Sequence, residues 1–483
     1  MPKPAKLSSD ELAFRLIDSP NLNFRLNFVW NKTEKIFYVF DEKENYYKIL
    51  DVDDDLSKII FQTLIEMKST PKDPIPYTQD LTPNLVSNII KILTWQCPRS
   101  IDLLSDNFVT FSDGKMMDLD TFSIHPVVRD KISLLKFPFP SSILEDPAVL
   151  CPNWLSFLND ILITKESSEF DNPIPDASLL SLIQEMFGCA LFSHSRYEST
   201  FFLYGNGQNG KSKLLSVLKT LFPKDLISCS TLEQLTTNRF KTASLVGKRL
   251  NVTSEEDSKF LASDVFKRIV SGEEISGERK FQKDFSFVPT CKMIFATNKI
   301  PTFDSIDYAI RRRIFIIPFF RKIPEAKKQI NIFEEKLLPE LPGIFKWALE
   351  GSKRLAQNEK FTHSDAVEKM RDTYERIQSS AVEFIQENFV ITGNYDDIFQ
   401  KARLFEGYKA WVEADAGRKP LGKMKFYDEL ENRYARQGLQ FPDQVVRHPL
   451  SHDPMRAVRG VKPTEDQTAW IHATNWLNGT FPV

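Results

Sequence analysis

The sequence predicts an α/β protein built around a parallel β-sheet, and three observations predict it. A glycine-rich loop, Gly205–Ser212, lies between a short apolar run at 201–204 and a segment whose apolar residues recur at helical spacing. Two more strand-like runs, 248–254 and 291–297, follow the loop and end in polar side chains. The chain has 42% apolar and 27% charged residues, which is typical of a globular protein with buried cores.

The N-terminal segment combines strand-like and helix-like patterns. Runs rich in aromatic and β-branched residues at 24–30, 36–40 and 46–50 are separated by polar segments and predict a small antiparallel sheet. Helical spacing follows at 56–67 and 85–93. Prolines then cluster near residue 140, as they do in linkers or exposed turns. We therefore expect a mixed α+β domain over residues 1–150.

The loop itself fits the pattern G-x-x-x-x-G-K-[ST] of a phosphate-binding P-loop. Glycines let the backbone turn tightly, so that successive N–H groups and a helix N-terminus face a polyphosphate. We expect Lys211 to reach the β- and γ-phosphates of ATP and the Ser212 hydroxyl to hold Mg²⁺. The predicted nucleotide-binding residues are Gly205, Asn206, Gly207, Gln208, Asn209, Gly210, Lys211 and Ser212.

The two strand-like runs after the P-loop end in side chains that suit hydrolysis. The first leads into Glu255 and Glu256, of which one would hold Mg²⁺ while its neighbour orients or activates the attacking water. Glu255 is the better candidate for both catalysis and metal binding, and Glu256 is its rival. The second ends at Asn298, whose amide would position water against the γ-phosphate, although Asn is also a common turn residue.

Three consecutive arginines, residues 311–313, precede another apolar run at 314–317. An arginine offered by a neighbouring subunit stabilises the charge on a phosphoryl group in transfer. Arg312 and Arg313 are the candidates for this role. The alternative is a basic turn on the surface.

A smaller unit is expected from Val382 onward. Two apolar stripes at helical spacing occur here, one formed by Leu404, Tyr408 and Trp411 and the other by residues 426, 430 and 434. The simplest interpretation is that both stripes are buried in a hydrophobic core. Between residues 418 and 462 there are ten Lys and Arg against five Asp and Glu. Duplex or origin DNA binding by Lys423, Lys425 and Arg459 is a weaker prediction from this local excess of positive charge.

The overall charge and the cysteine content limit the classes of function that fit this chain. The formal net charge is −2, so nucleic-acid binding must come from local patches or a pore. The five cysteines are scattered without metal-site or disulfide spacing, which is typical of a reduced, intracellular protein. No apolar run is long enough to cross a bilayer. We expect a protein of the host-cell cytoplasm without a membrane partner.

Taken in order, these motifs resemble the superfamily 3 helicases. The similarity is closest to the replicative primase-helicases of phages, plasmids and poxviruses, and it is strongest between residues 180 and 355. The phrases that carry it are Phe201–Ser212, Phe295–Pro301, Arg312–Phe319 and Glu340–Gly351.

The resemblance implies an AAA+ ATPase core over residues 151–355, a connecting helix over 356–381 and a winged-helix-like DNA-binding domain over 382–483. It also implies a ring, usually a hexamer, with active sites between subunits and Arg312 or Arg313 acting across the boundary. In this family the region between the acids and Asn298 supplies a hairpin that projects into the central channel. The predicted DNA-binding residues there are Lys267, Arg279, Lys280 and Lys283.

The expected function is an ATP-dependent replicative DNA helicase of a virus, phage or mobile element that translocates on single-stranded DNA as a ring. Its expected partners are single-stranded and forked DNA, further copies of itself and replication proteins. Two alternatives stay open, an ATP-switched initiator that binds an origin and the helicase part of a primase-helicase. The segment before residue 100 is too short for a full primase domain, so we expect no primase activity. The arginines at 311–313 and the lack of an evident site for a phosphoryl acceptor disfavour a small-molecule kinase.

Overall fold

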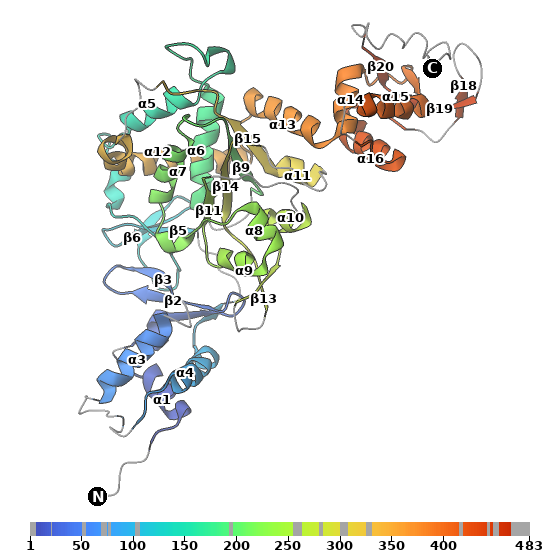
Figure 1. Ribbon diagram of the computed structural model, residues 1–483. Coiled ribbons are helices and arrows are strands. Elements are labelled where there is room, and N and C mark those ends of the chain that lie inside the picture. The colour runs from blue at the N-terminus through green and yellow to red at the C-terminus, as the bar shows by residue number, and fades with distance from the viewer. Residues whose placement is uncertain are drawn as a thin grey trace, which may run out of the picture. The chain divides into compact units, whose positions relative to one another are not determined.

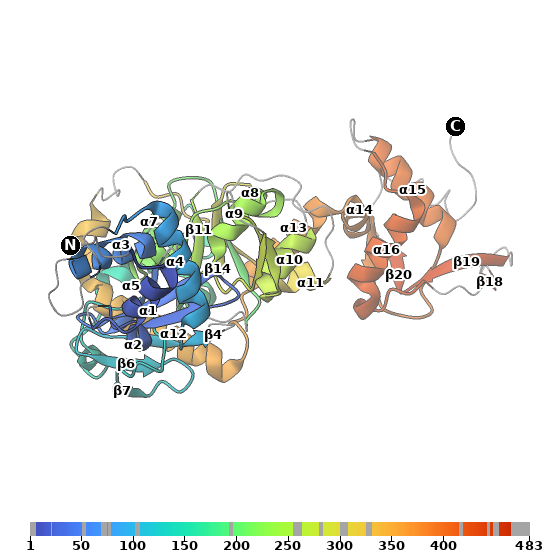
Figure 2. The same ribbon diagram turned by 90° about the horizontal axis from the view of Figure 1, so that it is seen from below.

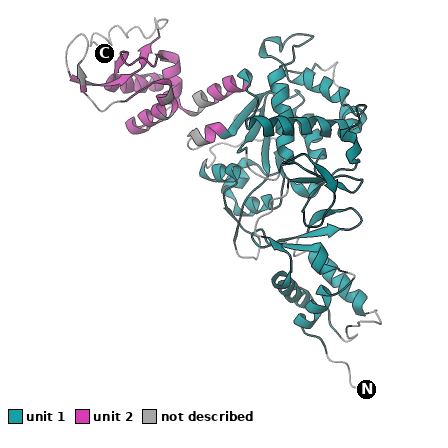
Figure 3. Cartoon of the chain, turned by 180° about the vertical axis from the view of Figure 1, so that it is seen from behind, with its two compact units in different colours: residues 1–301, 313–366 teal, residues 302–312, 367–483 magenta. Residues whose placement is uncertain are grey.

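The structure of the chain is a computed structural model that divides into two compact units (Figure 3). Residues 1–301 and 313–366 form the first unit, and residues 302–312 and 367–483 form the second. The structure describes residues 6–20, 22–50, 55–68, 75, 79–101, 107–192, 197–254, 263–279, 284–299, 308–324, 331–414, 419–441, 445–447 and 454–464. The domain boundaries expected from the sequence stay predictions.

The N-terminal part of the first unit contains the expected antiparallel sheet. Strands β1 (Phe28–Asn31), β2 (Ile36–Asp41) and β3 (Tyr46–Leu50) pair antiparallel, and the short β4 (Ser100–Ile101) adds in parallel to β1. One detail of the prediction was wrong, because residues 24–27 form a short helix, α2 (Phe24–Asn27), instead of strand. Phe24 and Phe28 are four residues apart and stack with ring centroids at 4.7 Å, which requires a helical turn between them.

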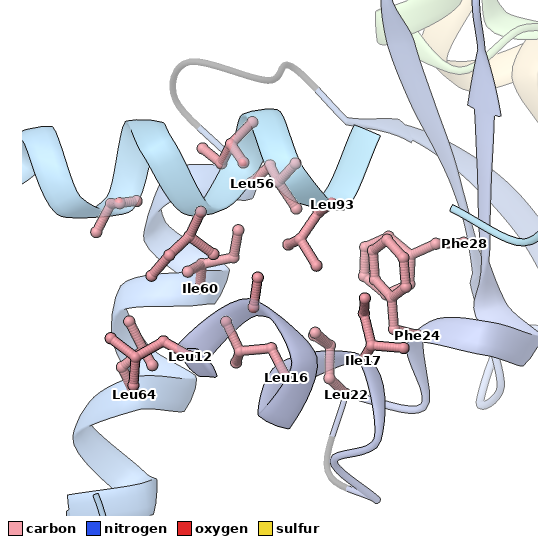
Figure 4. Close-up of a cluster of buried hydrophobic side chains, with 14 of the residues drawn as sticks. Leu12, Leu16, Ile17, Leu22, Phe24, Phe28, Leu56, Ile60, Leu64 and Leu93 are labelled. Carbon is pink, nitrogen blue, oxygen red and sulfur yellow. The ribbon is translucent and has the colours of Figure 1, made fainter. Parts of the chain in front are cut away.

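Three helices cover a hydrophobic core next to this sheet. They are α1 (Ser9–Ile17), α3 (Asp55–Lys68) and α4 (Pro83–Gln96), and they lie together in Figure 2. Leu16 from α1, Ile60 from α3 and Leu93 from α4 are fully buried and converge in Figure 4, where Phe24 and Phe28 close one end of the cluster. The predicted helices at 56–67 and 85–93 are therefore confirmed.

The centre of the first unit is a five-stranded, all-parallel sheet, as predicted. Its strands are β9 (Thr200–Tyr204), β10 (Ile227–Ser228), β11 (Leu250–Thr253), β14 (Lys292–Thr297) and β15 (Ile314–Pro318). They are arranged in the order β10-β11-β14-β9-β15. All six residues of β14 are buried, as expected of a strand covered on both faces. Because every strand is parallel, their carboxyl ends share one edge.

Helices cover both sides of this sheet. In Figures 1 and 2, α7 (Lys211–Thr220) and α12 (Leu341–Asn358) lie on one side, and α8 (Leu232–Thr237) and α10 (Ser263–Ser271) lie on the other. Helix α6 (Ala177–Leu191) packs closely on α12, where a Cβ added to Gly351 would lie 2.2 Å from the Gln184 carbonyl oxygen.

The remaining elements of the first unit are short. Strands β5 (Phe108–Thr110), β6 (Lys115–Asp118), β7 (Ile124–Pro126) and β8 (Leu135–Lys136) form a separate sheet in the order β7-β6-β5-β8. Strands β12 (Ile275–Gly277) and β13 (Phe285–Phe287) form an antiparallel pair. The helical segments are η1 (Ser141–Leu144), α5 (Pro152–Ile161), η2 (Lys165–Ser167), η3 (Lys224–Leu226), α9 (Arg239–Thr242), η4 (Ala243–Leu245), η6 (Phe333–Leu337) and η7 (Leu338–Glu340).

The second unit is a small α+β assembly with its own core. Residues 404, 408, 426, 430 and 434 are buried together, so the prediction that both apolar stripes are core is confirmed. Whether the unit is a winged helix stays a prediction. Its elements are α13 (Asp365–Gln378), which begins in the first unit, α14 (Ser380–Asn388), α15 (Lys401–Ala414), α16 (Lys423–Tyr434), η8 (Ala435–Gln437), β16 (Phe389–Ile391), β17 (Ile398–Gln400), β18 (Val445–Arg447), β19 (Pro454–Arg459) and β20 (Val461–Pro463).

Candidate functional site

The P-loop lies at the carboxyl end of β9, between that strand and α7. Strand β9 ends at Tyr204 and α7 begins at Lys211, so the strand–loop–helix order expected from the sequence is present. The strand is next to the centre of the sheet, with β14 on one side and β15 on the other. The loop is therefore held by a buried, rigid element, which is how proteins position functional loops.

The three glycines of the loop are not equivalent. A Cβ at Gly205 would lie 2.7 Å from the Phe319 carbonyl oxygen, and a Cβ at Gly210 would lie 2.7 Å from Ile161 Cγ2. Gly210 also has φ +86, a left-handed conformation that favours glycine. At Gly207 no atom lies within 4 Å of an added Cβ. Packing within the protein requires Gly205 and Gly210, whereas Gly207 faces open space.

Lys211 is the buried cation of the site. Its Nζ donates to the Gly205 carbonyl and, at 3.1 Å, to Asn209 Oδ1. Burial disfavours the charged form and lowers the pKa of Lys211 to about 8. The ammonium thus bonds to the loop's own oxygens, at the place where a polyphosphate would offer stronger, charged acceptors.

A cavity of about 620 Å³ opens beside the first half of the loop. The segment after β15 forms its opposite wall, because Phe319 N donates to the Tyr204 carbonyl at 2.8 Å and Ile323 N donates to the Gln208 carbonyl at 2.9 Å. The residues that line the cavity are Glu169, Tyr204, Gly205, Asn206, Gly207, Gln208, Pro318, Phe319, Phe320, Arg321 and Lys322. Its size is within the usual range for a small-ligand site.

Arg321, which was not predicted from the sequence, lies in this wall and contacts segments that precede the P-loop. Its side chain is 3% exposed, its Nη1 donates to the Phe170 carbonyl at 2.9 Å, and its Nε lies 3.6 Å from Asp160 Oδ1. The one signal available was a basic pair, Arg321 and Lys322, directly after an apolar strand. That signal does not identify the partners, which precede the P-loop in the chain.

Asn298 follows the strand next to the P-loop strand, as predicted. Thr297 lies opposite Tyr204 in the parallel pair of β14 and β9, and Gly205 N donates to the Thr297 carbonyl at 3.2 Å. Asn298 is therefore one residue beyond the point where the two strands leave the sheet, and its side chain is exposed. This arrangement brings the amide to the edge of the sheet that carries the P-loop.

The predicted metal-binding and catalytic acids lie outside the described residues. Strand β11 ends at Thr253, opposite Phe295 in β14, and Glu255 and Glu256 follow two and three residues later. Ser212, the other predicted Mg²⁺ ligand, is exposed in the first turn of α7. Within the described ranges no group of three or more His, Cys, Asp or Glu side chains is arranged to hold a metal ion.

The two candidate arginines differ in environment. Arg313 is 8% exposed at its side chain, and its Nη2 lies 2.8 Å from Glu198 Oε2, just before β9. Arg312 is exposed and belongs to the second unit, at the end of the short helix α11 (Tyr308–Arg313). The ion pair ties Arg313 to its own chain.

The predicted DNA-binding residues lie in or near the β12–β13 hairpin. Lys267 is on α10, where its Nζ lies 3.6 Å from Asp264 Oδ1, and its side chain is mostly buried. Arg279 follows β12, and its guanidinium donates to the Glu34 and Lys35 main-chain carbonyls at 3.4 and 3.5 Å. Lys280 and Lys283 lie outside the described residues. The hairpin is present, while DNA binding by these residues stays a prediction.

With the site's geometry established, comparison with known proteins gives two sequence matches. Residues 203–313 match the model of a family described as a family of unknown function, DUF5906. A protein of Acanthamoeba polyphaga mimivirus named "Putative helicase L207/L206" is 27% identical over 173 residues, which cover 34% of this chain. The match spans 18% of the relative's own length.

Solved structures align with a larger share of the chain than the mimivirus relative does, but at lower sequence identity. The A form of the apo C-terminal region of NrS-1 has a TM-score of 0.44 at 14% identity and covers 94% of this chain and 100% of that chain. A second apo structure of the same region has a TM-score of 0.43 at 13% identity, with the same coverage of both chains. Overlap at this level establishes neither a shared fold nor a shared activity. Among the described residues, no helix combines the length and apolar character that a bilayer span requires.

Proposed function

We propose that this chain is an ATP-hydrolysing motor that unwinds DNA in the replication of a virus, phage or mobile element. The observation that carries the proposal is the shared edge of the parallel sheet, where the P-loop and Asn298 leave adjacent strands. A phosphate-binding loop beside an exposed amide is the arrangement needed to hold a polyphosphate and to orient water against its last phosphate.

Each residue of the site has its own role in the proposed reaction. The backbone N–H groups of the loop and the N-terminus of α7 bind the polyphosphate, and Lys211 exchanges its bond to the Gly205 carbonyl for the β- and γ-phosphates. Ser212 and Glu255 are the proposed ligands of Mg²⁺, which neutralises charge on the phosphates when bound. Asn298 orients the attacking water. The cavity beside the loop takes the nucleoside end of ATP.

The mimivirus relative, which is named as a helicase, supports the proposal that ATP hydrolysis drives the unwinding of DNA. The motor works as a ring, with Arg312 from one protomer completing the site of its neighbour. Arg312 is the better of the two candidates because its side chain is exposed, whereas the Arg313 side chain is buried beside Glu198. The basic, aromatic-containing hairpin supplies the contacts to single-stranded DNA.

Unwinding of a forked DNA duplex by the wild type and by Lys211→Ala tests the proposal. We expect ATP-dependent unwinding by the wild type and a loss of about a hundredfold or more in Lys211→Ala, as for removal of a positioned charge donor. Lys219→Ala, at the other end of the same helix, is the matched control and should retain wild-type activity.

The same experiment separates the motor from its rival classes. A wild type that hydrolyses ATP and binds origin DNA but never separates strands would favour the ATP-switched initiator. Equal activity of the wild type and Lys211→Ala would contradict any role for the P-loop.

A further inference from the structure

The side chain of Asn209 is folded into the P-loop and does not face solvent. It is 2% exposed, whereas the neighbouring residues 206–208 are exposed. Its Nδ2 donates to the Asn206 carbonyl at 3.0 Å, and its Oδ1 accepts from Lys211 Nζ at 3.1 Å. One amide therefore joins the first half of the loop to the start of α7.

The two partners of this amide differ in their hydrogen-bonding chemistry. A main-chain carbonyl only accepts a hydrogen bond and an ammonium only donates one, so the side chain between them must present both a donor and an acceptor. Asparagine presents them on two separate atoms. The loop leaves room for the amide, because a Cβ added to Gly205 would lie 2.6 Å from Asn209 Nδ2. The glycine at 205 and the amide at 209 therefore fit each other.

The oxygens that hold Lys211 in the empty loop are neutral. They belong to the Gly205 carbonyl and to the Asn209 amide. A hydrogen bond between two charged groups is stronger than one with a neutral acceptor. A phosphate is therefore able to displace both oxygens from the ammonium, whereas the bond from Asn209 Nδ2 to the Asn206 carbonyl does not involve Lys211.

We propose that Asn209 is a positioning residue that braces the empty P-loop and holds Lys211 through a neutral, displaceable acceptor. ATP then meets a loop that already has its shape, which lowers the ordering cost of binding. On binding, Lys211 moves to the phosphates while Asn209 Nδ2 stays on the Asn206 carbonyl. The Asn209 side chain thus acts on the nucleotide through the loop and Lys211, without contacting it. This inference rests on the proposed binding of ATP.

Steady-state ATP hydrolysis by the full-length wild type and by Asn209→Ala tests the brace. We expect KM for ATP to rise about threefold to tenfold, the usual loss for a hydrogen bond, because the nucleotide must now order the loop. The kcat should stay within about twofold of the wild-type value, since the lost stabilisation affects bound ATP and its transition state equally. Asn331→Ala removes a surface hydrogen bond to Glu335 in the same unit and is the matched control, which should match the wild type.

Asn209→Asp tests the requirement for a neutral acceptor. The two side chains have the same size, but the carboxylate pairs with the Lys211 ammonium and offers no donor to the Asn206 carbonyl. ATP must then break an ion pair inside the loop and approach an added negative charge. We therefore expect KM to rise about thirtyfold or more, above the value for Asn209→Ala.

The direction of each change decides the inference. A lower KM in Asn209→Ala would mean that the amide only competes with ATP, and an unchanged KM would mean that it does not brace the loop. A KM for Asn209→Asp at or below that of Asn209→Ala would mean that the charge at 209 does not reach Lys211. Each of these results overturns the inference. Melting curves of all variants exclude unfolding, which lowers kcat through loss of active protein.

Lys211→Ala distinguishes failure of this inference from failure of the proposed function. If Lys211→Ala abolishes ATP hydrolysis while both Asn209 variants match the wild type, the inference alone is wrong. If the wild type neither binds nor hydrolyses ATP, the inference and the proposed function both fail.

Discussion

If the chain binds ATP as proposed, Lys211 links nucleotide binding to protonation. Its pKa is lowered to about 8 by burial, so close to half of the free protein carries a neutral amine at that pH. Anionic phosphates favour the charged form and raise the pKa again. ATP binding near pH 8 should therefore take up about half a proton, and near pH 6.5, where Lys211 is already charged, the uptake from this group should vanish.

Calorimetric titration in two buffers of different ionisation enthalpy measures this uptake. ATP has lost its own titratable proton near pH 8, since phosphate groups titrate near pH 6, so the signal belongs to the protein. Lys211→Arg is the control, because a guanidinium stays charged throughout. Uptake that persists in Lys211→Arg would assign the proton to another group. Without ATP the same lowered pKa makes the free energy of unfolding rise between pH 8 and the ordinary lysine range near 10.5.

Two glycines of the P-loop allow a matched comparison. Gly210→Ala places a Cβ 2.7 Å from Ile161 at φ +86 and should destabilise the core by roughly 1–2 kcal/mol or more. Gly207→Ala meets no protein atom within 4 Å and should leave the melting temperature unchanged. Thermal unfolding of both variants without nucleotide checks this difference. Equal losses in the two variants would mean that the loop has another conformation.

At the scale of elements, α6 and α12 are joined by an ion pair between a buried carboxylate and a half-buried arginine. Glu185 is fully buried on α6 and accepts from Arg354 Nε at 2.7 Å, while Arg354 also donates to Gln184 Oε1 and to the Ser181 carbonyl. Removal of Arg354 leaves the buried Glu185 carboxylate with hydrogen bonds from Thr362 but without its counter-charge. Arg354→Ala should therefore destabilise the first unit by about 1.5–3 kcal/mol, the usual loss for a hydrogen bond to a charged group.

The neighbouring lysine provides the control for this prediction. Lys353 pairs with Glu350 on the surface of the same helix, and exposed pairs of this kind contribute about 0.5 kcal/mol or less. Denaturant unfolding of Arg354→Ala and Lys353→Ala should show a large loss only in the first. Similar losses would indicate that the helix itself, and not its pair with Glu185, decides stability.

The elements that the sequence predicted well are those whose signal is local. Strand β14 is entirely buried and helix α3 repeats its apolar residues at helical spacing, so a short window of sequence contains each pattern. The four residues of α2 were predicted as strand because an aromatic run also suits a sheet, whereas in the structure Phe24 stacks on Phe28 across a helical turn. The strand order and the pairing of Arg313 with Glu198 join residues far apart in the chain, which no local pattern specifies.

In the candidate site, too, the predictable parts were those with a local signal in the sequence. The P-loop and Asn298 follow from the residues at the ends of buried strands, and parallel pairing then brings them to one edge of the sheet. Arg321 was missed because its partners, Asp160 and Phe170, precede the P-loop by more than thirty residues.

At the scale of the whole molecule, the question is whether one protomer completes the site of another. Lys211 is buried in the P-loop of its own chain, and Arg312 is exposed at the end of α11. If Arg312 acts on a neighbour's ATP, Lys211→Ala and Arg312→Ala should each abolish hydrolysis for different reasons. Each variant retains the half of the site that the other has lost.

Mixing the two inactive variants tests this arrangement directly. In rings assembled at random from equal amounts, about a quarter of the interfaces join an intact Lys211 to an intact Arg312 from the adjacent protomer. ATP hydrolysis should therefore recover to roughly that fraction of the wild-type rate, and dilution that separates the protomers should abolish it. A mixture of Lys211→Ala with itself sets the baseline. If both groups act within one chain, no mixture recovers activity, because no protomer contains both.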